Sequence, residues 1–196
     1  MGIYNFKRFI QILGGSFVTL FIILELVRGH YGQLDAKLLW EDFGTCSSIV
    51  LIIGFCFDRW MWKWPIFQKW LVPFPCLAGE WEGHIFYNWD GSDRDKKIKL
   101  MIRQTFLQVL VYIETNESYS NSICASFDFD EMRGHRDLIY SYINEPNVTI
   151  RDRSQIHYGT ARLRYKAEDN TLEGTYWTDR KSVGDIILTR IKPKTC

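Results

Sequence analysis

The sequence predicts a hairpin of two transmembrane helices followed by an all-β domain that folds as an antiparallel up-and-down barrel of eight strands. Two observations predict this fold. Two long apolar runs lie near the start of the 196-residue chain, and beyond Gly79 the apolar residues recur with a period of two. A period of two is typical of β-strands, because successive side chains of a strand point to opposite faces of the sheet.

The two apolar runs, at about residues 9–27 and 38–57, are the predicted transmembrane helices. Each is long enough to cross a hydrocarbon layer of roughly 30 Å as an α-helix. The first run has a basic start but no small-residue cleavage site, and a second apolar run follows it. We therefore expect the first run to be retained as a membrane helix and not to be cleaved as a signal peptide.

Basic residues predict the orientation of the hairpin. Lys7 and Arg8 precede the first run, and Arg59, Lys63 and Lys69 follow the second, whereas the connecting loop mixes basic and acidic residues. Cytoplasmic segments beside membrane helices carry an excess of lysine and arginine. The sequence therefore predicts a two-pass protein with both termini in the cytoplasm.

A tryptophan-rich segment, Trp60–Trp70, follows the second helix. Tryptophan prefers the headgroup zone of a bilayer and lysine extends its charge toward that zone, so we expect an interfacial segment here. The alternative is that some of these rings pack against the base of the next domain. Pro73 and Pro75 then form a stiff spacer. We accordingly place the transmembrane unit at residues 1–72 and the β-domain at residues 76–196.

Composition and motifs exclude several classes of function. The net charge of +1 gives no overall field that would attract DNA or RNA, so we expect no nucleic-acid partner. The five cysteines are odd in number and lack metal-ligand spacing, which predicts unpaired thiols and no metal site. The sequence contains no phosphate-binding loop, nucleophile elbow or zinc-protease motif. We therefore expect a protein that is not an enzyme and needs no cofactor.

Short polar turns divide the region beyond Gly79 into eight candidate strands. The strands are predicted at Gly79–Asn88, Lys96–Gln104, Phe106–Thr115, Tyr119–Phe129, Arg136–Asn144, Gln155–Lys166, Thr171–Thr178 and Gly184–Ile191. Short strands with tight polar turns favour an antiparallel meander. Such a meander closes most simply into a barrel, here of lipocalin-like form, because closure leaves no exposed edge. A barrel of this size is either filled by its own side chains or holds one small ligand.

Alternation along the strands predicts inward side chains that are apolar at one end of several strands and polar at the other. Inward hydroxyls and amides cost free energy unless water, another polar group or a ligand satisfies them. In the first interpretation, these residues bind a ligand. The faces of the tyrosines would stack on a base, the amides and hydroxyls would form hydrogen bonds, and the guanidinium of an arginine would pair with a phosphate. The alternative is ordinary barrel core with solvent-facing serines. The candidate ligand-binding residues are Tyr87, Gln104, Ser120, Ser122, Tyr142, Asn144, His157, Tyr176, Thr178 and Arg180.

Several short motifs, taken in order and spacing, resemble a known family. They are GEWEG (Gly79–Gly83), Gln104, SYSNS (Ser118–Ser122), YSYINEP (Tyr140–Pro146), HYGTARL (His157–Leu163), LEGTYWTDR (Leu172–Arg180) and Gly184. Behind a helix hairpin, this arrangement resembles the two-transmembrane, β-strand-rich effectors of bacterial cyclic-oligonucleotide antiphage signalling (CBASS). The similarity spans nearly the whole chain.

The resemblance implies a function that the residues alone do not. It implies a barrel that binds a cyclic dinucleotide, self-association through the transmembrane helices into oligomers, and disruption of the bacterial inner membrane as an abortive-infection response. A related defence arrangement uses the same architecture with the opposite sign, in which the nucleotide holds the effector silent and its loss releases killing. A membrane-tethered lipocalin-like carrier of apolar ligands, or an adaptor with a filled barrel, are the alternatives from other classes.

Overall fold

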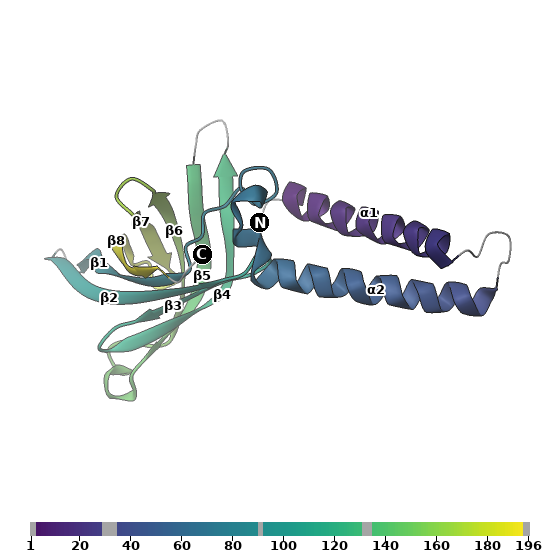
Figure 1. The fold of residues 1–196 in the computed structure, drawn as a ribbon. Coiled ribbons are helices and arrows are strands. Elements are labelled where there is room, and N and C mark those ends of the chain that lie inside the picture. The colour runs from purple at the N-terminus through teal and green to yellow at the C-terminus, as the bar shows by residue number, and fades with distance from the viewer. Residues whose placement is uncertain (1–2, 29–34, 90–91, 131–134, 194–196) are drawn as a thin grey trace. The chain divides into compact units, whose positions relative to one another are not determined.

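The computed structural model describes residues 3–28, 35–89, 92–130 and 135–193 (Figure 1). The chain divides between Pro73 and Phe74 into two compact units. The first unit holds two helices and an aromatic segment, and the second unit holds a β-barrel.

The first unit contains the two apolar helices that the sequence predicts, α1 (Ile3–Arg28) and α2 (Ala36–Arg59). Among the described residues, the stretches Phe6–Arg28 and Ala36–Arg59 are long and apolar enough to cross a membrane. The helices pack antiparallel. The ring centroids of Phe9 and Phe57 lie 5.2 Å apart, as do those of Phe17 and Phe43. The prediction of a helix hairpin is confirmed.

The hairpin carries a buried ion pair. The Asp42 side chain is fully buried and bonds the Arg28 guanidinium, which is 40% exposed at the last residue of α1. A buried carboxylate without a cation would be costly, so this pair links the two helices near the connection between them. The connection itself, residues 29–34, lies outside the described residues.

The aromatic segment forms two short 3₁₀ helices, η1 (Met61–Lys63) and η2 (Pro65–Phe67). Trp62 is fully buried, whereas Trp60, Trp64 and Trp70 are about half exposed. The Gln68 side chain donates to the carbonyl of Trp62 at 3.0 Å and holds the segment together. Its position at a membrane surface stays a prediction.

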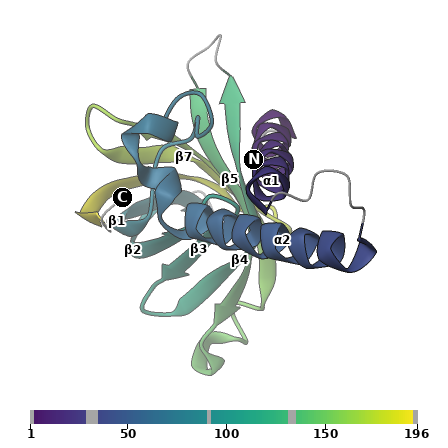
Figure 2. The ribbon, with the colours of Figure 1, turned by 45° about the vertical axis from the view of Figure 1, so that its right-hand side comes forward.

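The second unit is the closed antiparallel barrel that the sequence predicts (Figures 1 and 2). Within the described residues, consecutive strands pair in sequence order and β1 also pairs with β8, which closes the barrel. The strands are β1 (Gly79–Trp89), β2 (Ser92–Gln104), β3 (Val109–Glu114), β4 (Ser118–Asp130), β5 (His135–Pro146), β6 (His157–Lys166), β7 (Thr171–Thr178) and β8 (Val183–Pro193). A third 3₁₀ turn, η3 (Val148–Ile150), lies between β5 and β6.

One end of the barrel is filled. The inward side chains there are large and apolar, and each is at most 1% exposed: Trp81, Ile98, Leu100, Ile102, Leu138, Leu163, Leu172 and Leu188. The segment Phe74–Ala78 packs at this end, with the Phe74 ring stacked on Phe127 at 5.3 Å. The alternation that the sequence predicts for these strands is confirmed. The filled end supplies the hydrophobic stabilisation of the domain.

Two polar contacts complete this end. The Trp81 indole donates to the carbonyl of Leu77 at 3.0 Å, and the Arg190 guanidinium lies over the Trp81 ring at 5.2 Å. Burial lowers the pKa of the Arg190 guanidinium. Burying a charged guanidinium costs free energy. The face of the Trp81 ring and the carbonyl of Ala78, which accepts a hydrogen bond from Arg190, offset part of that cost.

The cysteines differ in part from expectation. Cys46, Cys56 and Cys124 are free thiols. Cys76 is disulfide-bonded. The prediction that every cysteine is unpaired is therefore wrong at Cys76, because spacing along a sequence does not show which thiols meet in space.

Candidate ligand pocket at the open end of the barrel

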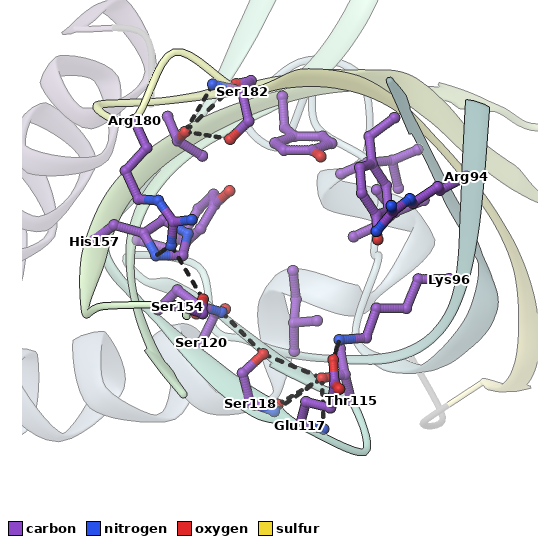
Figure 3. A pocket seen from close by; sticks show the side chains of 18 of the residues that line it. Arg94, Lys96, Thr115, Glu117, Ser118, Ser120, Ser154, His157, Arg180 and Ser182 are labelled. Atoms are coloured by element: carbon purple, nitrogen blue, oxygen red, sulfur yellow. Dashed lines mark hydrogen bonds and ion pairs between the residues drawn. The ribbon is translucent and has the colours of Figure 1, made fainter. Parts of the chain in front are cut away.

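The end of the barrel opposite Phe74–Ala78 holds a cavity of about 350 Å³ (Figure 3). Every strand of the barrel contributes to its lining, together with the turns between strands. The volume falls in the range of roughly 300–1,000 Å³ that is typical of small-ligand pockets. The barrel is therefore filled at one end and hollow at the other.

Most of the predicted site residues meet in this cavity. The eight that line it are Tyr87, Ser120, Tyr142, Asn144, His157, Tyr176, Thr178 and Arg180. They come from β1, β4, β5, β6 and β7 and from the turn after β7. Inward alternation toward one rim brings them together, and ligand binding by them stays a prediction.

Gln104 does not reach the cavity, because it lies at the filled end. Its Oε1 atom accepts from the amide of Leu77 at 2.8 Å, and its Nε2 atom donates to the carbonyl of Pro75 at 3.1 Å. Neighbouring antiparallel strands run in opposite directions, so the last residues of β2 lie beside the first residues of β1. The pairing of Gly79 with Ile102 shows this. Gln104 thus holds the Phe74–Ala78 segment in place.

Ser122 is also absent from the lining of the cavity. Its hydroxyl accepts from the amide of Val111 at 2.9 Å. Pairing of β3 with β4 extends only to Tyr112 opposite Asn121, and the register of β4 shifts just beyond Ser122. The Ser122 hydroxyl therefore satisfies a backbone donor that the interrupted ladder leaves without a partner strand.

Several lining residues were not among the predicted ones. Arg94 and Lys96 enter the cavity from the start of β2, and Glu117, Arg153 and Ser154 enter from connections between strands. Alternation carried backward from Ile98 would have placed Lys96 and Arg94 on the inward face. No periodicity predicts where the connections fold.

Glu117 holds two of the cationic side chains. Its Oε2 atom lies 2.8 Å from Lys96 Nζ, and its Oε1 atom lies 2.5 Å from Arg153 Nη2. The hydrogen bond from Lys96, together with the charge of Lys96 and of Arg153, lowers the pKa of the Glu117 carboxyl. These bonds tie the β5–β6 connection to the turn between β3 and β4.

A second set of bonds orders the opposite side of the cavity. Arg180 Nη1 donates to Ser154 Oγ at 3.1 Å and to the carbonyl of Gln155 at 3.4 Å, and lies 3.4 Å from His157 Nδ1. Figure 3 shows Arg180 and His157 on one side of the cavity and Arg94 and Lys96 on the other. A guanidinium has five N–H donors, so Arg180 can hold these partners and still donate to a ligand.

Asn144 is oriented by two serines. Its Nδ2 atom donates to Ser120 Oγ at 2.8 Å and to Ser118 Oγ at 3.2 Å. The Ser118 hydroxyl in turn lies 3.1 Å from Thr115 Oγ1. The network fixes the plane of the amide, and with it the direction in which its carbonyl oxygen accepts a hydrogen bond.

Tyr142 and Tyr176 carry neutral hydroxyls in the cavity. Burial, with Tyr87 nearby, raises the pKa of Tyr176 to about 12. Burial, with Tyr176 and Asp179 nearby, also raises the pKa of Tyr142. Both side chains are only 8% exposed. Their hydroxyls are therefore donors at neutral pH, and their rings are flat apolar surfaces.

The cavity combines an excess of positive charge with aromatic faces. Among the described lining residues, the lysine and arginine side chains are Arg94, Lys96, Arg153 and Arg180, and the one carboxylate is Glu117. Such a lining suits a small anionic ligand that carries flat rings. The fold and the site together define a small-ligand receptor, built as a half-filled β-barrel in a chain with two membrane-length helices.

Comparisons with known proteins agree with this class. The family model described as Cap15, cyclic dinucleotide receptor domain, matches residues 72–190. A CD-NTase-associated protein 15 from Staphylococcus schleiferi is 32% identical over 189 residues, which cover 95% of this chain and 97% of that protein. A CD-NTase-associated protein 15 from Yersinia aleksiciae is 28% identical over 200 residues, covering 94% and 90%. The chain belongs to the Cap15 family, and its predicted relation to CBASS effectors is confirmed.

Proposed function

We propose that this chain is a membrane-anchored antiphage effector that binds a cyclic dinucleotide in its barrel. Binding drives self-association through the two helices, and the assembly disrupts the bacterial inner membrane. The observation that carries the proposal is the cationic, tyrosine-lined cavity, found inside a cyclic dinucleotide receptor domain that shares one chain with two membrane-length helices.

The charges of the cavity suggest how the ligand is held. A cyclic dinucleotide carries two phosphates across a ring from each other, and Arg94 and Arg180 lie on opposite sides of the cavity (Figure 3). Arginine pairs with phosphate through two parallel N–H donors. The faces of Tyr142 and Tyr176 stack on the bases. The protein performs no reaction on the ligand and needs no cofactor.

The proposed topology follows from the charge bias of the sequence. Residues 1–72 form a two-pass anchor with both termini in the cytoplasm, and residues 76–196 form a cytosolic sensing domain. A ligand can shift assembly only if it binds the assembled state better than the single chain. We assign this preference to the ligand-bound barrel, so that the nucleotide activates and does not restrain.

The binding test removes one arginine and one ring together. Full-length Arg180→Ala/Tyr142→Ala in detergent should lose binding of cyclic dinucleotides by calorimetry, because a charged fork and a stacking face are both gone. The matched control is Arg103→Ala/Tyr158→Ala, which removes the same two residue types at exposed positions outside the cavity. The control should bind as the wild type does. Equal affinity of the two double variants would contradict the proposed pocket.

A further inference from the structure

The tyrosines of the cavity alternate with small residues around one row of the barrel. The register between neighbouring strands gives the row Tyr140, Ala161, Tyr176, Gly184 and Tyr87, from β5 around to β1. One row nearer the open end, Tyr142 lies directly opposite Gly159. Residues directly opposite each other on neighbouring strands share one face of the sheet, so each ring has a small neighbour on the inner wall.

The Tyr142 ring occupies the space that a side chain at position 159 would fill. A Cβ atom built on Gly159 would lie 2.4 Å from both Cζ and Oη of Tyr142, and 2.9 Å from Cε1. The ring therefore reaches sideways across the backbone of β6 and lies along the barrel wall. Any other residue at position 159 would force Tyr142 into a different rotamer, and the space left to the ring is the cavity.

The surroundings of Gly159 differ from those of the other strand glycines. A Cβ atom on Gly83 would lie 2.0 Å from the carbonyl oxygen of Ile187, and one on Gly174 would lie 1.9 Å from that of Arg162. Both of those glycines permit two backbones to approach. At Gly159, by contrast, the three nearest atoms all belong to the Tyr142 side chain. A substitution there displaces a ring and not a strand.

We propose that Gly159 is a positioning residue of the ligand pocket. It lets the Tyr142 ring lie along the wall, which keeps the open end of the barrel hollow and turns the ring face toward the lumen as a platform for one base of the ligand. Gly184 is a mixed case: a Cβ atom built there would lie 2.2 Å from the carbonyl oxygen of Phe86 and 2.7 Å from Cε1 of Tyr176, whose ring offers a second face. The platform role rests on the proposed function, because it requires a ligand with flat bases.

A double-mutant cycle tests this role in the full-length protein in detergent. Gly159→Ala should remain folded and bind cyclic dinucleotides roughly tenfold or more weakly, because the displaced ring blocks the lumen and one stacking face is lost. Added to Tyr142→Ala, the same substitution should have little further effect, because the ring that it displaces is absent. The comparison variant Gly174→Ala should lower the thermal midpoint strongly, because its Cβ meets backbone.

The result that overturns the inference is additivity. If Gly159→Ala weakens binding equally with and without the Tyr142 ring, its effect is a general one on the barrel. Thermal midpoints measured without ligand separate a failure of this inference from a failure of the proposed function. They are compared for the wild type, Gly159→Ala, Tyr142→Ala and the variant that carries both substitutions. Tyr142→Ala should relieve any loss of midpoint caused by Gly159→Ala, and no relief would refute the packing of the ring on the glycine. Absence of nucleotide binding in the wild type would instead refute the proposed function, and the platform role with it.

Discussion

At the scale of single residues, Tyr142 and Tyr176 shape the open end of the barrel. Tyr142 and Tyr176 are largely buried, yet they line a cavity and leave it hollow. Their hydroxyls stay protonated because burial raises their pKa values. A neutral phenol can donate to a phosphate or to a base oxygen, whereas a phenolate would repel the anionic ligand.

This burial predicts a loss of stability at high pH. The pKa of Tyr176 is about 12 in the folded protein, against about 10 in an unfolded chain. Because the folded value is the higher one, the stability contributed by the neutral hydroxyl is complete below about pH 10 and is lost as the pH rises toward 12. Thermal midpoints of the wild type should therefore fall across this window more steeply than those of Tyr176→Phe. Parallel curves would show that Tyr176 is not buried as described.

The sequence predicts many of the cavity residues but not the end of the barrel to which each belongs. Eight of the ten predicted residues line the cavity. Gln104 does not, because alternation gives the face of a strand and says nothing of its direction relative to its neighbours. Arg94 was missed because the predicted strand begins only at Lys96, and Lys96 was not assigned to the inward face, although both residues share the face of Ile98. The roles of Glu117 and Arg153 depend on how connections fold, which no pattern in the strands encodes.

At the scale of elements, the strands and the helices follow their sequence patterns closely. All eight strands were predictable, since tight polar turns separate them and burial alternates along them. The boundaries of the strands were harder to predict. For example, β2 begins at Ser92, four residues before its predicted start. The charged residues Asp93, Arg94 and Asp95, which precede the predicted start, pair with β1 and therefore belong to the strand. The β5–β6 connection is ordered by Arg153 and Arg180, whose partners lie far away in sequence.

The helix hairpin yields an asymmetric prediction about its ion pair. Asp42 is fully buried, whereas Arg28 is 40% exposed at the end of α1 and can extend toward a polar surface. Arg28→Leu should therefore destabilise the hairpin more than Asp42→Leu, by up to about 3–5 kcal/mol, because it leaves a buried carboxylate unpaired. Arg28→Leu/Asp42→Leu should recover most of the loss. Thermal unfolding followed by helical circular dichroism in nanodiscs gives the order, and the reverse order would place Asp42 at a polar surface.

At the scale of the whole molecule, one chain joins a receptor barrel to two membrane-length helices. The family match covers the barrel, and the CD-NTase-associated relatives align with the helices as well, so the two units occur together in these proteins. Coupling between them requires that ligand in the barrel favours one arrangement of the hairpins over another. In the proposed function, the cavity receives the ligand and the result of the coupling is damage to the bilayer.

Dye release from vesicles tests this coupling most directly. Full-length protein is reconstituted into vesicles of phosphatidylethanolamine and phosphatidylglycerol, and a cyclic dinucleotide is added to the side that the barrels face. Release should begin on addition of the ligand, with a midpoint that follows the binding affinity, and should be absent with Arg180→Ala/Tyr142→Ala. Release that is independent of the ligand, or that the ligand suppresses, would contradict the claim that an occupied barrel drives membrane disruption.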